Sequence, residues 1–165
     1  MALKPQRRVV TTHKGTASAI MIDETVNLIS QGNASLRTLW QSHEHPALLD
    51  EQRDMADESQ GFYAKGSLIR VLDLEPKAVG FNHRTASLDY GIIMQGSAEM
   101  VLEDGSKTIC NAGDVVVQRG TMHQWNNPTD KPTRIIFVLL PAKPPVVEGA
   151  ELGDSGLPKL PGQNH

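Results

Sequence analysis

Two glycine-bounded segments, each carrying a histidine, place the tightest constraint on the fold of this chain. The first spans residues 80–96 (GFNHRTASLDYGIIMQG) and the second spans residues 113–127 (GDVVVQRGTMHQWNN). Between them, apolar and polar residues alternate on either side of Asp104-Gly105, a dipeptide typical of a tight hairpin turn. The two segments therefore lie at the two ends of one predicted hairpin. We expect them to form a single small-molecule site inside a β-barrel.

The rest of the chain also favours short strands. Residues 8–23 predict a hairpin with a glycine turn, and residues 35–42 (SLRTLWQS) and 67–75 alternate with the period of half-buried strands. Residues 134–140 (RIIFVLL) form a continuous apolar run, which suits a strand buried on both faces. Because most turns contain Gly or Pro and no strongly amphipathic helix is evident, the chain is predicted to be an all-β barrel or jelly roll.

The segment at residues 42–61 (SHEHPALLDEQRDMADESQG) breaks this strand pattern. It is rich in charge, and Pro46 can open a short helix through Met55, so we expect a loop with one or two helical turns. His43 and His45 form an H-x-H pair there, a spacing that on a strand would aim both imidazoles at one metal. Since proline follows at once and no strand pattern surrounds the pair, we interpret them as surface histidines.

Composition excludes several classes of protein. With 165 residues the chain suits one domain, and its net charge of -3 gives no basic stripe for nucleic acid. No apolar run approaches the roughly 20 residues that span a bilayer, and the N-terminus lacks the apolar core of a secretory signal. The single cysteine, Cys110, is interpreted as a small core residue. We expect a soluble cytoplasmic protein without nucleic-acid or membrane partners.

The strand pattern and the composition along the sequence predict three parts of the chain. Residues 1–7 are an N-terminal arm, residues 8–141 are the barrel domain, and residues 142–165 are a tail rich in Pro and Gly that we expect to be flexible. There is no glycine-rich nucleotide motif, so a nucleotide cofactor is not expected.

Three further residues are candidates for the wall of the pocket. Arg70 shares its predicted strand face with leucines and serves either as a rim residue or as a pocket cation for a carboxylate or enolate. Trp40 and Trp125 are either core residues or the aromatic lining of a substrate pocket.

The two histidine segments resemble the paired motifs of the cupin superfamily, which have the forms G-x5-H-x-H-x3/4-E-x6-G and G-x5-P-x-G-x2-H-x3-N. In the first motif His83 takes the place of the first histidine, Thr85 that of the second, and Asp89 that of the glutamate. In the second motif His123 is the histidine, Asn127 the asparagine, and Arg119 is aligned with the proline. The resemblance implies a cupin-type double-stranded β-helix and is narrowest for the small single-domain cupins of fungal secondary-metabolite clusters.

The resemblance also implies a ligand set. Cupin motifs supply histidines and a carboxylate to one metal, and here His83, Asp89 and His123 would remain as ligands for iron, manganese or zinc. Thr85 is a poor substitute for imidazole. Two options stay open: a divalent metal held by these three residues, or a metal-free acid–base site made of the same residues.

We expect an enzyme of the lyase or isomerase type that acts on a polyketide-like intermediate by dehydration, decarboxylation or isomerisation. In this hypothesis His123 is the general acid or base, His83 and Asp89 assist it, Arg70 stabilises an anion, and Thr85 contacts the substrate with the two tryptophans. The alternatives are an Fe(II)-dependent oxidoreductase or dioxygenase and a non-catalytic binding module. The resemblance also implies a homodimer.

Overall fold

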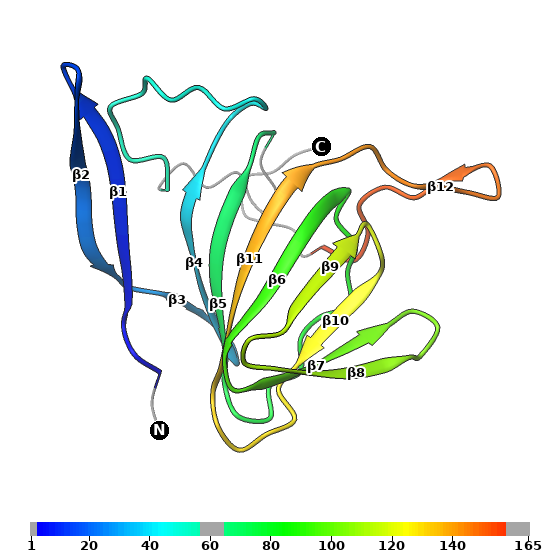
Figure 1. The fold of residues 1–165 in the computed structure, drawn as a ribbon. Helices are drawn as coiled ribbons and strands as arrows, with labels where there is room; N and C mark the ends of the chain where they lie inside the picture. Colours follow the sequence, from blue (N-terminus) through cyan, green and yellow to red (C-terminus); the bar gives the residue numbers. More distant parts are fainter. Residues whose placement is uncertain (1–2, 57–64, 158–165) are drawn as a thin grey trace.

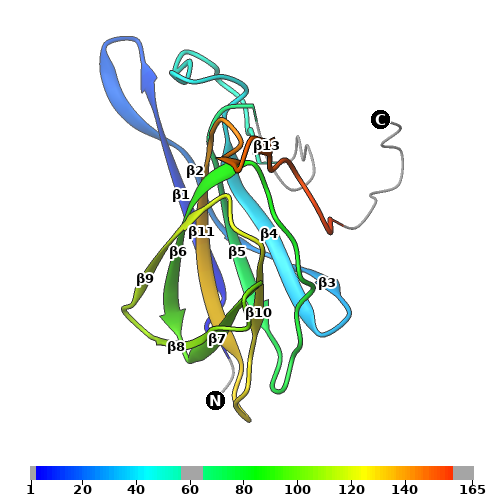
Figure 2. The same ribbon diagram turned by 90° about the vertical axis from the view of Figure 1, so that its right-hand side faces the viewer.

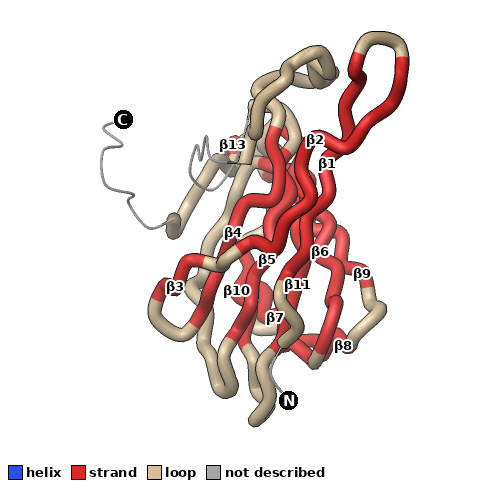
Figure 3. The backbone as a smooth tube through the Cα atoms, turned by 90° about the vertical axis from the view of Figure 1, so that its left-hand side faces the viewer, coloured by secondary structure: helices blue, strands red, loops and turns tan. Residues whose placement is uncertain are grey.

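The computed structural model describes residues 3–56 and 65–157. They form two facing β-sheets, with an N-terminal hairpin standing beside the larger sheet (Figures 1 and 2). No helix occurs in the described residues, as Figure 3 shows, so the helical turns predicted from Pro46 through Met55 are absent. Consequently none of the described segments is a helix long and apolar enough to cross a membrane. Residues 42–56 form a loop, and residues 57–61 of the predicted segment lie outside the described residues.

The larger sheet has β11 at its centre, because this apolar strand pairs with β5 on one side and β6 on the other. All neighbouring strands are antiparallel. In spatial order the sheet contains β3 (Ile29–Gln31), β4 (Ala34–Gln41), β5 (Leu68–Leu74), β11 (Thr133–Pro141), β6 (Ser87–Gln95) and β9 (Val115–Arg119).

The smaller sheet contains the predicted hairpin. Its order is β10 (His123–Asn126), β7 (Ser97–Leu102) and β8 (Lys107–Asn111). Isolated bridges from Val79 to Asn126 and from His83 to His123 add the segment at 79–83 to its open edge. The two histidine segments therefore meet side by side, as the sequence predicts.

Each face of β11 contributes to a different core. Ile135, Phe137 and Leu139 point between the two sheets, where they pack in a cluster that also contains Cys110, a buried free thiol as predicted. Ile136 points to the other side and packs with Val71 and its neighbours beneath the end of the hairpin. The prediction of a strand buried on both faces is therefore confirmed.

The N-terminal hairpin consists of β1 (Gln6–Lys14) and β2 (Ala17–Val26), which pair only with each other among the described strands. Buried Arg8 donates to the carbonyl of Leu39 in β4 at 2.9 Å and to Oδ1 of Asp54 at 2.9 Å. One guanidinium thus joins the hairpin both to the larger sheet and to the loop at 42–56.

The described part of the predicted tail is not free of structure. Residues 142–157 contain the hairpin of β12 (Val146–Val147) and β13 (Ala150–Glu151). Beyond it, the N–H of Arg84 donates to the carbonyl of Ser155 at 2.8 Å and the N–H of Ser155 donates back at 3.0 Å. This part of the tail therefore contains a short hairpin and contacts the segment before β6, and residues 158–165 lie outside the described residues.

A buried ion pair fastens the start of the chain to the central strands. Arg134 of β11 donates to both carboxylate oxygens of Asp73 in β5, at 2.7 and 2.6 Å, and also to the carbonyl of Lys4 at 2.7 Å. The two side chains are 10% and 17% exposed. Removing one partner of such a pair leaves a buried charge uncompensated.

We therefore predict that Arg134→Ala lowers the free energy of unfolding by about 3 kcal/mol. The matched control is Arg7→Ala, which removes an equally bidentate pair with Asp23 whose side chains are 68% and 41% exposed. That variant should lose much less stability than Arg134→Ala, because water screens exposed pairs. Urea denaturation of both variants measures the difference, and equal losses would contradict the assignment.

Candidate functional site

A cavity of about 390 Å³ opens between the two sheets. Most of its wall is apolar, contributed by leucines of β4, β5 and β11 together with Phe81, Trp125 and Phe137. Its ionisable groups and one hydroxyl come from β5, β6 and the segment before β6: Arg70, His83, Thr85 and Asp89. Two amides, Gln31 and Asn33, complete the polar part of the wall near the β3–β4 turn. A mostly apolar cavity of this size with a few convergent polar groups is typical of a small-molecule site. We call it the barrel cavity.

The backbone holds the two histidines together. The N–H of His83 donates to the carbonyl of His123 at 3.0 Å, and the N–H of His123 donates to the carbonyl of His83 at 2.9 Å. Their ring centroids lie 4.4 Å apart. Gly80 allows this approach, because a Cβ there would lie 2.3 Å from the carbonyl oxygen of Trp125.

Backbone carbonyls fix the tautomer of both imidazoles. Nδ1 of His83 lies 3.2 Å from the carbonyl of Phe81, and Nδ1 of His123 lies 2.8 Å from that of Thr121. A carbonyl oxygen can only accept, so each Nδ1 carries a hydrogen, and in the neutral ring Nε2 carries the lone pair. Each histidine, when neutral, therefore presents a basic Nε2.

Gln118 of β9 connects three other residues of the site. The indole N–H of Trp125 donates to its Oε1 at 2.7 Å. Because an indole can only donate, the oxygen of the carboxamide must face Trp125 and the NH₂ group must face the other way. Nε2 then donates to Oδ2 of Asp89 at 3.2 Å and to Nε2 of His123 at 3.3 Å. The lone pair of His123 is therefore engaged by an amide hydrogen.

The charges of the site lie on Arg70 and Asp89. Burial lowers the pKa of Arg70 to about 10, and the nearby carboxylate of Asp89 opposes this shift. Burial likewise raises the pKa of Asp89 above its ordinary value, against the opposing effects of His123, Gln118 and Arg70. Arg70 thus remains a cation at neutral pH inside an otherwise apolar wall.

Both histidines are held neutral. Burial is the main cause, and it lowers the pKa of His83 to about 4, with His123 and Arg70 contributing in the same direction. Burial also lowers the pKa of His123, although the hydrogen bond to Thr121 and the charge of Asp89 oppose it. Of the two, His83 is among the described residues that line the barrel cavity and His123 is not.

The donor set does not fit a metal ion. The hydroxyl of Ser87 donates to buried Thr85 at 2.9 Å, and the single lone pair on Nε2 of His123 that a cation needs already accepts an amide hydrogen of Gln118. Oδ2 of Asp89 accepts the other amide hydrogen, and among the described residues the buried Oδ1 of Asp89 has no hydrogen-bond partner. In the parts of the chain that the structure describes, no three His, Cys, Asp or Glu side chains form a group that could hold a metal. The predicted set of His83, Asp89 and His123 is close in space but is not arranged as ligands.

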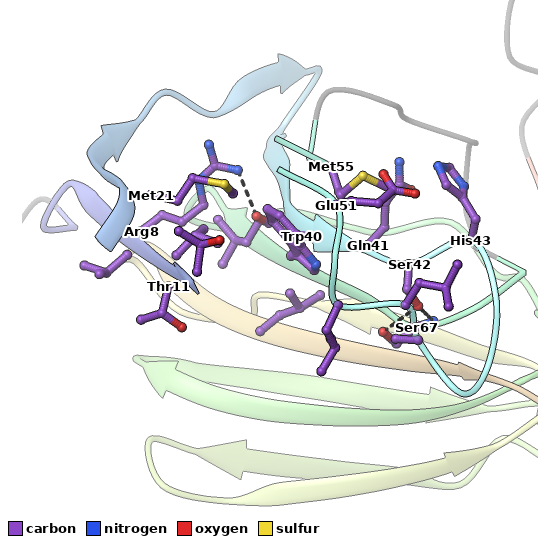
Figure 4. A pocket seen from close by; sticks show the side chains of 18 of the residues that line it. Arg8, Thr11, Met21, Trp40, Gln41, Ser42, His43, Glu51, Met55 and Ser67 are labelled. Atoms are coloured by element: carbon purple, nitrogen blue, oxygen red, sulfur yellow. Dashed lines mark hydrogen bonds between the residues drawn. The ribbon is translucent and has the colours of Figure 1, made fainter. Parts of the chain in front are cut away.

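Trp40 lies elsewhere, which corrects its expected place in this cavity. A β-bulge between Thr38 and Trp40 inserts one residue, so that Trp40 pairs with Ile69 and turns to the outer face of the larger sheet. There it lines an outer cavity of about 700 Å³ between the hairpin, β4 and the loop at 42–56, with Arg8 and Ser67 (Figure 4). His43 lines the same outer cavity, whereas His45 is exposed.

Sequence reasoning missed Gln118, although the motif contained a signal. Counting P-x-G-x2-H back from His123 places Gln118, and not Arg119, at the proline position. A polar residue at a position usually occupied by proline would have marked it. Asn127 is buried and donates to the carbonyls of Glu75 and Lys131 at 2.9 and 2.7 Å, so it holds the loop after β10.

Comparison with known proteins agrees with this geometry. The family model described as "Cupin domain" matches residues 70–139, which include both histidine segments. The cupin-domain-containing oxidoreductase virC of Hypocrea virens is 30% identical over 151 residues, covering 85% of this chain and 78% of that protein. The chain belongs to the cupin family.

Other relatives of this cupin carry the names of biosynthetic clusters. Oryzines biosynthesis cluster protein J of Aspergillus oryzae is 36% identical over 67% of this chain, and phomopsin biosynthesis cluster protein D of Diaporthe leptostromiformis is 42% identical over 56%. The chain spans 63% and 49% of their lengths. Among solved structures, the cupin domain of Schizosaccharomyces pombe Cnp3 has a TM-score of 0.55 at 13% identity, covering 84% of this chain and 89% of that domain, which supports the fold alone.

The buried state of His83 predicts a pH-dependent stability. Its pKa is about 4 in the folded protein and about 6.5 in the unfolded chain, so between these values the unfolded chain binds the extra proton. This residue therefore makes the protein less stable as the pH falls from about 6.5 to about 4, and has no further effect below that range.

We expect His83→Asn to flatten this dependence. Urea denaturation of both proteins between pH 4 and pH 7 should show a smaller loss of unfolding free energy in the variant, and the NMR titration of His83 should give a midpoint near 4. An imidazole that titrates near 6.5 would contradict the buried, neutral state.

Proposed function

We propose that this cupin is an enzyme of secondary metabolism and that its first chemical step removes a proton from a small, ring-containing substrate. The observation that carries the proposal is the neutral Nε2 of His83, presented to an apolar cavity that also contains Arg70 and Asp89. A base and a fixed cation in one mostly apolar cavity suit the formation of an enolate or phenolate. Trp125 and Phe137 provide an aromatic wall for the ring.

In this proposal the roles of the two histidines are exchanged relative to the sequence-based hypothesis. His83 accepts the proton, since it lines the cavity, whereas the lone pair of His123 accepts an amide hydrogen of Gln118. The ring of His123 packs against the ring of His83, with their centroids 4.4 Å apart. The proton on His83 and the guanidinium of Arg70 then offset the negative charge that forms on the substrate.

We propose oxidoreductase as the reaction class. The names of four relatives, which call them cupin-domain-containing oxidoreductases, favour it over the lyase or isomerase expected from the sequence. An enolate or phenolate gives electrons to an oxidant such as molecular oxygen far more readily than the neutral substrate does, so proton removal is a suitable first step. The acid–base groups of the cavity favour a second candidate, a lyase or isomerase, because proton transfer to and from the substrate needs only a positioned base and acid.

Proton removal can be tested apart from the reaction class. A panel of β-diketones and polyhydroxylated aromatic compounds is incubated with the protein in D₂O, under argon and with a chelator, and deuterium incorporation at acidic C–H groups is followed by NMR. We expect exchange with the native protein and a loss of at least about 10²-fold in His83→Gln, the usual contribution of a positioned base.

The control is His45→Gln, which alters an exposed histidine and should leave exchange unchanged. Thermal unfolding verifies that both variants are folded. Full exchange in His83→Gln would refute the assignment of the base. If the native protein catalyses deuterium exchange in none of the probe compounds, a binding module would be favoured. Admission of oxygen then separates the classes: oxygen uptake indicates an oxidoreductase, and redox-neutral turnover under argon indicates a lyase or isomerase.

A further inference from the structure

We propose that Gln118 replaces the metal ion of the cupin site, supplying two N–H donors to Asp89 and His123 where a metal-dependent site would supply a cation. In this view the carboxamide is a positioning residue that keeps the donor residues assembled without metal. The proposal concerns the composition of the site and does not depend on the reaction class proposed above.

Every polar group of the Gln118 carboxamide has a hydrogen-bond partner. The carboxamide of Gln118 has one oxygen and two N–H groups, and each finds a partner: Trp125, Asp89 and His123. Its side chain lies in the interior, and the residue is 3% exposed. A metal bound to Nε2 of His123 would take the one lone pair of that nitrogen, which an N–H of Gln118 now uses. In Asp89 the other N–H uses Oδ2, whereas the buried Oδ1 has no hydrogen-bond partner among the described residues.

Moving the side chain of Gln118 aside would break a buried hydrogen bond to Trp125. The indole N–H of Trp125 is buried with that residue, which is 4% exposed, and the carboxamide oxygen accepts its hydrogen at 2.7 Å. If the side chain swings away, both the indole and the amide must find new partners in the interior, which buried polar groups require. The packing of Trp125 against Phe137, at a centroid distance of 5.9 Å, restricts any adjustment of the indole.

Both motifs of this chain differ from the cupin pattern at positions that face the site. In the first motif Thr85 stands at the position of the second histidine, and its hydroxyl accepts a hydrogen bond from Ser87. In the second motif Gln118 stands at the proline position and faces the same residues. One change removes a ligand and the other places hydrogen-bond donors against two of the remaining ones. Both differences lower the affinity that the site would have for a metal cation.

The test measures metal binding directly. Native protein and Gln118→Glu are stripped with a chelator and then titrated with Mn²⁺, Zn²⁺ and, without oxygen, Fe²⁺; metal content and the shift of Tm are recorded. In the variant one carboxylate oxygen can still accept from Trp125, while the other faces the carboxylate of Asp89, and a divalent cation relieves that repulsion. We expect substoichiometric metal in the native protein, and in the variant one equivalent bound at least roughly tenfold more tightly, with a metal-dependent rise in Tm.

The matched control is Gln124→Glu. Gln124 lies in the same β10 strand as Trp125, and its amide donates to Asn126 at 2.9 Å, outside the donor set. This variant carries the same change in charge and should bind no more metal than the native protein. If Gln124→Glu also binds additional metal, the tighter binding of Gln118→Glu would be due to charge alone, and the proposal would be overturned.

A second pair of variants keeps the proposal testable if Gln118→Glu does not fold. Thr85→His restores the missing ligand but leaves the carboxamide in place, so it should remain metal-poor. The double variant Thr85→His/Gln118→Ala removes the amide as well and should bind one equivalent. The proposal is wrong if the native protein binds stoichiometric metal that Asp89→Asn abolishes, or if the folded variants lacking Gln118 remain metal-poor. Neither readout requires turnover.

Discussion

The pair of backbone hydrogen bonds between His83 and His123 is the interaction on which the site depends. It joins segments that stand at opposite ends of the β7–β8 hairpin, and it adds the segment at 79–83 to the edge of the smaller sheet. Because the bonds are made by the backbone, the spacing of the two rings is set by the sheet. The side chains can therefore change their chemistry within the family while the cavity keeps its place.

Two arginines on neighbouring strands, Arg134 buried and Arg70 half-buried, have different roles. Arg134 of β11 points to the outer side of the larger sheet, where a bidentate carboxylate and a backbone carbonyl satisfy it. Arg70 of β5 points to the barrel cavity, among leucines and near Asp89. A buried guanidinium is costly to desolvate, and a ligand anion in the cavity would compensate it further. The first arginine holds the fold together, and the second gives the cavity its electrostatic preference.

Much of the fold follows from the sequence, because alternation and turn chemistry are local. The strands of residues 68–74 and 133–141, the hairpin around Gly105 and the placement of Arg70 on a leucine face are all of this kind. Trp40 was misplaced because a bulge reverses the alternation by one residue, and nothing in SLRTLWQS marks a bulge. The role of Gln118 depends on Trp125 in the opposite sheet, and the attachment of Ser155 to Arg84 is made only by backbone groups. Neither leaves a periodic pattern.

The contact between Gln118 and Trp125 also bears on what the site can do. Since the indole fixes the orientation of the carboxamide, Asp89 and His123 face N–H dipoles, and Arg70 is the cation that the described part of the cavity wall presents to a ligand. Fixed dipoles and one guanidinium stabilise an anion without supplying or accepting electrons. The residues of this cupin therefore suit the generation of a reactive anion. In an oxidation the electrons would leave the substrate for an oxidant brought to the cavity with it.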